Sequence, residues 1–173
     1  MTYPIEAMVR NPEEGGYTTV MYDERSFGVF LEDEVARSTT IDGDLTLLLV
    51  AGNGISVAEA VVKNTRPFGI RGELRRDLIG VILPDFDLLE STKVAGQILQ
   101  DVLQTQVSVS LALLQKIGRR YEVAKPLYER ATEGLTAVKR RGQQIAIILA
   151  TGQSLTQDQL PQNLRHKTIL VRK

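Results

Sequence analysis

The fold is decided by residues 88–141, which read LLESTKVAGQILQDVLQTQVSVSLALLQKIGRRYEVAKPLYERATEGLTAVKRR. Apolar residues in its first part fall four or seven positions apart, at Val94, Ile98, Val102, Val109, Leu113 and Ile117. This spacing lines one face of an α-helix, while polar residues line another face. The stretch therefore predicts a long amphipathic helix that begins near Leu88.

A second helix is predicted after a break at Gly118, because a glycine just past the last apolar position is typical of a helix end. Pro126 suits the first turn of the next helix, where its missing N–H has no partner to lose. Apolar residues then recur three or four positions apart, at Leu127, Ala131, Leu135 and Val138. Gly142 would end this helix. The two helices together form a predicted helical hairpin over about residues 88–141.

One alternative remains open within the first helix. Val107, Val109, Leu111 and Leu113 also alternate with smaller residues, and a period of two is typical of a β-strand. We favour the helix because its period holds along the whole run. In a helix, Val107, Leu111 and Leu114 form a second apolar stripe, which we expect to contact a partner chain.

Strand patterns surround this stretch. A hairpin is predicted from residues 17–22 and 27–31, which are rich in β-branched and aromatic residues. Continuous apolar runs at 45–50 and 78–83 predict strands buried on both faces, and further strands are predicted at 143–150 and 168–171. The sequence thus predicts an α+β fold, with a mixed or antiparallel sheet from the N-terminal half and the C-terminal strands beside the helical hairpin.

A single domain over residues 1–173 is expected from a length that is sufficient to bury one core. It divides into a strand-rich acidic part (1–87), the helical hairpin (88–141), and C-terminal strands with a basic tail (142–173). No apolar run is long enough to span a membrane, and the first residues lack a secretory signal. We therefore expect a soluble, cytoplasmic protein.

The charges are unevenly distributed along the chain. Residues 1–90 contain 8 basic and 16 acidic residues, whereas residues 91–173 contain 13 basic and 5 acidic ones, giving net charges of about −8 and +8. If the halves stay apart in the fold, they can attract another subunit or an acidic polymer. If the fold interleaves the two halves, this separation of charge disappears.

Residues 52–56 have the order strand, Gly-x-Gly, helix that opens a dinucleotide-binding turn. Gly52 and Gly54 supply two glycines, but the third would fall at Val57. We therefore interpret the segment as a tight turn in which Ser56 caps the following helix.

Candidate catalytic and metal-binding residues are sparse. The one histidine, His166, lies between two cations and is interpreted as exposed, and the chain has no cysteine. Two carboxylate pairs at strand ends have oxygen ligands that Mg²⁺ prefers: Asp42 with Asp44, and Asp85 with Asp87. Aspartates are also common in turns and helix caps, so we predict no catalytic, cofactor or metal site.

These observations predict a non-enzymatic structural or assembly subunit, either a homo-oligomer or part of a larger protein assembly. The predicted partner-binding residues are Val107, Leu111, Leu114, Lys139, Arg140 and Arg141. A nucleic-acid-binding protein that uses the basic C-terminal half is the first alternative. A carboxylate-metal-dependent hydrolase is the second.

Overall fold

The computed structural model describes residues 7–10, 18–66, 68–102, 106–117, 120–150 and 152–172. Among these residues, six strands form one main sheet. In order across the sheet they are β10 (Thr168–Arg172), β9 (Ile145–Leu149), β6 (Ser108–Leu113), β3 (Leu45–Ala51), β5 (Leu78–Pro84) and β4 (Ile70–Arg75). Strand β3 is antiparallel to β5 and β6, whereas β9 is parallel to β6 and β10. The sheet is therefore mixed.

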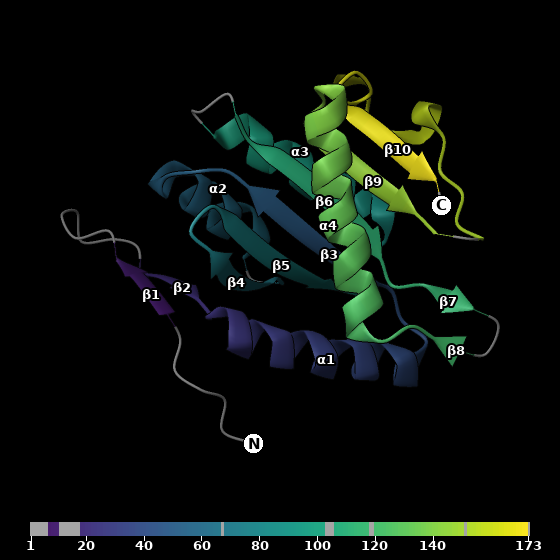
Figure 1. The fold of residues 1–173 in the computed structure, drawn as a ribbon, viewed down its shortest axis with the longest axis horizontal. Coiled ribbons are helices and arrows are strands. Elements are labelled where there is room, and N and C mark those ends of the chain that lie inside the picture. Colours follow the sequence, from purple (N-terminus) through teal and green to yellow (C-terminus); the bar gives the residue numbers. More distant parts are fainter. Residues whose placement is uncertain are drawn as a thin grey trace.

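Helices cover both faces of this sheet (Figure 1). Helices α1 (Glu24–Ile41) and α4 (Ala124–Arg141) pack on one face, and α2 (Ile55–Thr65) and α3 (Leu88–Asp101) pack on the other. The result is three layers, and it confirms the predicted α+β class with a mixed sheet.

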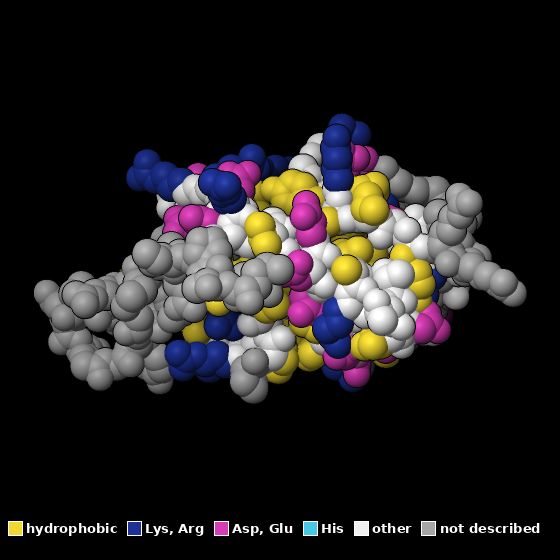
Figure 2. Space-filling view, turned by 90° about the horizontal axis from the view of Figure 1, so that it is seen from below, with side chains coloured by type: hydrophobic (Ala, Val, Ile, Leu, Met, Phe, Trp, Pro, Cys, Tyr) yellow, Lys and Arg dark blue, Asp and Glu magenta, His cyan; other side chains and the backbone are white. Residues whose placement is uncertain are grey.

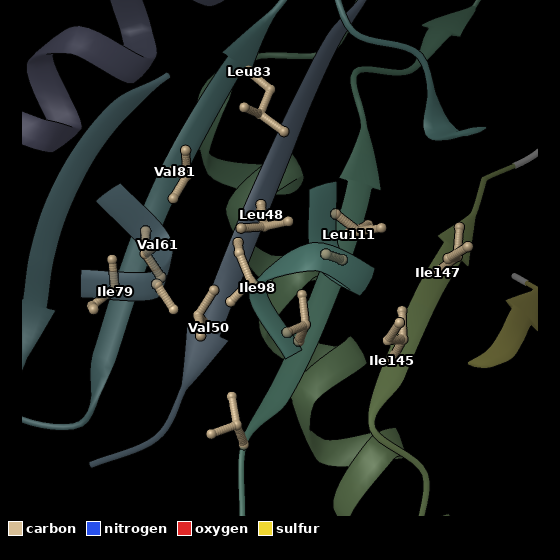
Figure 3. Packing of buried hydrophobic residues seen from close by; sticks show 14 of the residues in the cluster. Leu48, Val50, Val61, Ile79, Val81, Leu83, Ile98, Leu111, Ile145 and Ile147 are labelled. Atoms are coloured by element: carbon tan, nitrogen blue, oxygen red, sulfur yellow. The ribbon is translucent and has the colours of Figure 1, made fainter. Parts of the chain in front are cut away.

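Each face of the sheet has its own hydrophobic core. Leu45, Leu47 and Leu49 of β3 contact the α1/α4 side, while Leu48 and Val50 contact the α2/α3 side. Figure 3 shows the second core, where side chains of α2 and α3 lie over the sheet. Both faces of β3 are buried, which explains its continuous apolar run.

The predicted helical hairpin is wrong. Helix α3 ends at Asp101, and β6 begins at Ser108 between β3 and β9. The strand alternative for Val107 to Leu113 is therefore the correct one. Pairing on both sides satisfies the backbone of β6, and this tertiary context outweighs a local helical period. Gly118, the predicted break, lies outside the described residues.

The predicted apolar partner stripe is also wrong. Val107, Leu111 and Leu114 are only 3%, 0% and 1% exposed. They contribute to the cores on the two faces of the sheet. A residue buried in this way cannot contact a partner chain.

The predicted strand at residues 27–31 is part of α1 instead. The Asp23 carboxylate accepts a hydrogen bond from the Ser26 N–H at 2.7 Å and caps this helix. Phe27, Leu31 and Val35 follow at intervals of four and are buried. A helical apolar face and a cap therefore outweigh the local strand propensity.

Other predicted elements agree with the structure. Helix α4 ends at Arg141, Gly142 follows as its C-cap with a left-handed φ of 66°, and Lys139, Arg140 and Arg141 in the last turn are exposed. Strands β5, β9 and β10 occupy their predicted positions. Outside the main sheet, β1 (Ala7–Arg10) pairs with β2 (Thr18–Met21), and β7 (Lys116–Ile117) pairs with β8 (Arg120–Tyr121).

The two charge halves remain apart within the sheet. Strands β3, β5 and β4 come from the acidic half and lie together, while β6, β9 and β10 come from the basic half. The boundary is the pairing of β3 with β6.

Candidate functional site

One edge of the main sheet brings together the end of β3, the β4–β5 turn and the starts of β6 and β9. Ala51 at the end of β3 pairs with Leu78 at the start of β5 and with Ser108 at the start of β6. Val109 pairs in turn with Ile145 at the start of β9. Loop residues that converge at such an edge are not hydrogen-bonded into the sheet, so they can bind ligands.

A small cleft of about 260 Å³ opens at this edge on the α2 side. Its lining comes from the end of β2, the β3–α2 turn, the first turns of α2, and the β4–β5 hairpin. The lining residues are Met21, Gly52, Asn53, Gly54, Ile55, Ala58, Glu73, Arg76 and Ile79.

The first turn of α2 forms one wall of the small cleft. Gly54 precedes the helix with a φ of 106°, a conformation that favours glycine. No side chain caps α2, and its first turn contains no acidic residue. Because the first N–H groups of a helix have no intrahelical partner, this end carries partial positive charge.

Arg76 lines the same small cleft and supplies a cation there. It is exposed in the β4–β5 turn and forms no ion pair with any residue that the structure describes. The turn is held against β3 by a hydrogen bond of 3.0 Å from the Gly52 N–H to the Asp77 carbonyl. The N–H groups at a helix start and a guanidinium can each bind a phosphate or a carboxylate.

Glu73 places a carboxylate in the same cleft. Its backbone N–H donates to the Tyr22 carbonyl at 2.9 Å, which fixes β4 beside the residues that follow β2. A carboxylate at this place can accept hydrogen bonds from hydroxyl groups. The small cleft thus combines groups that can bind an anion with a carboxylate that can accept a hydrogen bond from a hydroxyl group of the same ligand.

A large cleft of about 870 Å³ opens on the α4 side of the same edge. Gly52 and Asn53 line both clefts, and the β4–β5 turn separates them. Arg75 at the end of β4 and Asp77 of the turn line the large cleft, and Lys139 lines it from α4.

A third hollow of about 620 Å³ lies between α1 and the start of α4. It is lined by apolar groups such as Val35 and Val123 and by the charged residues Glu32, Glu122 and Lys125. Figure 2 views this side from below and shows acidic side chains next to apolar ones. These residues form a groove without a cluster of convergent polar groups.

The two predicted carboxylate pairs already have protein partners. Lys116 Nζ lies 3.3 Å from Asp42 and 4.0 Å from Asp44. Hydrogen bonds from Tyr121 and then from Lys116 lower the pKa of Asp42. Within the described part of the chain, no three His, Asp or Glu side chains form a group that could hold a metal ion.

Asp85 and Asp87 do not face a common ligand either. Asp85 lies 3.3 Å from Arg37, while Asp87 caps α3 by accepting from the Glu90 N–H at 2.8 Å. His166 is exposed, and Ser56 is not the cap of α2, because the helix begins one residue earlier and Gly54 holds the cap position.

Sequence patterns predicted the Gly52–Gly54 turn, but they selected neither Glu73 nor Arg76 as a site residue. Both depend on the β4–β5 hairpin, which returns the chain beside β3. The charged tripeptide at 75–77 ahead of a predicted buried strand was the available signal, because it marks a turn at the same edge as Gly52.

Comparisons with known proteins identify the fold. Sequence comparison finds no matching family model and no matching curated protein. Comparison of structures, in contrast, finds 62 similar chains. The GGDEF domain of DgcB from Caulobacter crescentus in complex with c-di-GMP has a TM-score of 0.65 and 18% identity, covering 80% of this chain and 98% of that one.

Two further structures are diguanylate cyclases. The active GGEEF domain of such an enzyme from Vibrio cholerae has a TM-score of 0.62 and 12% identity, covering 71% of this chain and 94% of that one. The cyclase SiaD from Pseudomonas aeruginosa, solved with its activator SiaC, has a TM-score of 0.63 and 17% identity, covering 72% of this chain and 57% of that one. The protein therefore has a GGDEF-like fold.

These neighbours overturn the prediction of a non-enzymatic structural or assembly subunit, because the fold is one that diguanylate cyclases adopt. They give no support to nucleic-acid binding. The residues that name these domains, Gly-Gly-Asp-Glu-Phe or Gly-Gly-Glu-Glu-Phe, do not occur as a run in this sequence. None of the described helices is long and apolar enough to cross a membrane.

Proposed function

We propose that this chain binds a guanine nucleotide, with a phosphate of the nucleotide in the small cleft. The observation that carries the proposal is that the uncapped start of α2 and Arg76 line the same cleft. Support for guanine comes from the similar GGDEF domain of DgcB, which was solved with c-di-GMP.

The cleft offers a separate role to each of its polar groups. The N–H groups at the start of α2 and the Arg76 guanidinium would hold phosphate oxygens. Glu73 would accept a hydrogen bond from a ribose hydroxyl, a role that acidic residues have at other nucleotide sites. A volume of about 260 Å³ accommodates these two parts of a nucleotide, and the base would extend beyond it.

Binding of GMP, GTP and c-di-GMP, measured by calorimetry with ATP as the comparison, tests the proposal. The variant Arg76→Ala should weaken guanine-nucleotide binding about tenfold or more, since charge-assisted hydrogen bonds to phosphate are lost. Arg25→Ala, at an exposed arginine on α1, is the matched control and should bind as the parent does. The absence of binding in the parent, or equal loss in both variants, would overturn the proposal.

The same samples test catalysis. GTP is incubated with Mg²⁺ or Mn²⁺, and the products are separated by chromatography. Formation of c-di-GMP that Arg76→Ala abolishes would extend the function from binding to synthesis. Binding without product would restrict it to recognition.

We also propose that the domain contacts a protein partner, as SiaD contacts its activator in the similar structure. Lys139, Arg140 and Arg141 remain the predicted contact residues, and self-association, a cytoplasmic location and a single domain over 1–173 remain predictions. Light scattering of the isolated chain at several concentrations measures self-association directly.

A further inference from the structure

We infer that the large cleft is a second ligand site, which binds a nucleoside phosphate independently of the small cleft. Its volume of about 870 Å³ is that of an organic-ligand pocket. The inference goes beyond the proposed function, because it concerns the opposite side of the β4–β5 turn.

Two cations face the large cleft from different elements. Arg75 is the last residue of β4, and Lys139 lies in the last turn of α4. Both side chains are exposed, and neither forms an ion pair with another described residue. Asp77 is the one carboxylate among the lining residues, so the net charge of the lining is positive. This charge favours a phosphate.

The rest of the lining suits a nucleoside. Leu135 and Val107 line the cleft but are only 6% and 3% exposed, so apolar contact with a ring would come from the partly exposed Ala51 and the methyl group of the exposed Thr132. Four polar side chains from different parts of the chain also line the cleft, namely Asn53, Gln106, Thr136 and Gln144. Amide and hydroxyl groups both donate and accept, so they can match the polar edge of a base and the hydroxyls of a ribose.

Substitutions of the adjacent residues Arg75 and Arg76 distinguish binding in the large cleft from binding in the small cleft. Arg76 lines the small cleft alone, and Arg75 lines the large cleft alone. Nucleoside phosphate bound to Arg76→Ala protein therefore reports on the large cleft, even if a nucleotide also binds in the small one. The failure of either site leaves the other measurable.

The experiment is titration of isotope-labelled Arg76→Ala protein with AMP and GMP, followed by NMR. Backbone amides of residues 106–108 and 143–144 should shift with saturation, and those of Gly54 and Ile55 should not. Adding Arg75→Ala and Lys139→Ala should weaken binding about tenfold or more. Lys93→Ala, at an exposed lysine on α3, is the control and should change nothing.

Ribose 5-phosphate and inorganic phosphate complete the series and should bind progressively more weakly, since they lack the base. Equal binding of inorganic phosphate and AMP would overturn the inference, because the apolar surface would then contribute nothing. Unchanged affinity in the Arg75→Ala, Lys139→Ala variant, or no shifts at residues 106–108, would also overturn it.

Discussion

The two faces of the main sheet are packed in different ways. Both cores consist mainly of branched aliphatic side chains, but on the α1/α4 face helix and sheet also meet closely at glycines, with Gly72 and Gly80 against Phe27 and Gly134 against Ser110. At a glycine contact the neighbouring group packs against backbone atoms, which cannot move aside, while aliphatic side chains can change rotamers and repack. The α1/α4 face should therefore tolerate added or removed volume less well.

Phe27 gives the clearest case on the α1/α4 face. Its ring lies over Gly72 and Gly80, which pair with each other across β4 and β5. A Cβ added at either glycine would approach within 2.7 Å of the phenylalanine side chain. Only glycines at both strand positions leave room for this ring.

A second close approach fixes α4. A Cβ at Gly134 would overlap the Ser110 hydroxyl of β6. Nearby, the buried Arg130 guanidinium pairs with Glu122 and donates to the Leu113 carbonyl. These contacts connect α4 to β6 and to the segment after β8, and the large cleft lies along the same helix.

Phe27→Ala should have the largest effect on stability. Removing a ring that is 1% exposed leaves a cavity above the two glycines, which cannot collapse to fill it. The expected loss is about 3–5 kcal/mol of unfolding free energy. Denaturant unfolding measures it, and a loss below that of Ile98→Val would refute the proposed difference between the faces.

Gly72→Ala should follow, with a loss of about 1–3 kcal/mol, because the added methyl group overlaps the Phe27 ring. Gly28→Ala is the matched control within α1, where an added Cβ meets no atom within 4 Å. It should be neutral or stabilising by up to about 1 kcal/mol, since alanine favours helix. Equal losses in both variants would mean that the ring contact has no role.

Ile98→Val samples the α2/α3 face, where Ile98 is buried among aliphatic side chains of the sheet. Neighbouring side chains can move into the space of one lost methylene group. The expected loss is about 0.5–1.5 kcal/mol in the same unfolding measurement. A loss as large as that of Phe27→Ala would show that this face is equally rigid.

Sequence patterns correctly predicted the elements whose buried residues form a recognisable pattern within the element itself. Strands β3 and β5 follow from continuous apolar runs, and α4 follows from apolar spacing that stops at Gly142. For β6 the local pattern fits both a helix and a strand, and the choice depends on pairing with β3 and β9. That pairing joins residues far apart in the sequence, so no local period reveals it.

The candidate site was only partly predictable, because strand pairing also brings its residues together from distant parts of the sequence. The Gly52–Gly54 turn is a local signal and was found, although its role was interpreted as structural. Arg76 and Glu73 reach it through the antiparallel pairing of β3, β5 and β4. For α1, Asp23 followed by Phe27, Leu31 and Val35 at intervals of four was a usable signal that the strand propensity of the same residues concealed.

The smallest expected effect concerns the cap that begins α1 and so positions Phe27. The Ser26 N–H donates to the Asp23 carboxylate, and this bond lowers the pKa of Asp23 below its ordinary value of 3.8, with nearby Arg25 acting in the same direction. A lowered folded-state pKa means that the carboxylate stabilises the fold above pH 3.8, and that this contribution is lost as the pH falls further, through the folded-state pKa.

Asp23→Asn keeps a capping oxygen but does not titrate. Thermal melts should therefore agree for parent and variant near neutral pH, while the parent should lose more stability than the variant as the pH is lowered through 3.8. Parallel curves would show that the cap of α1 does not depend on the charge of Asp23.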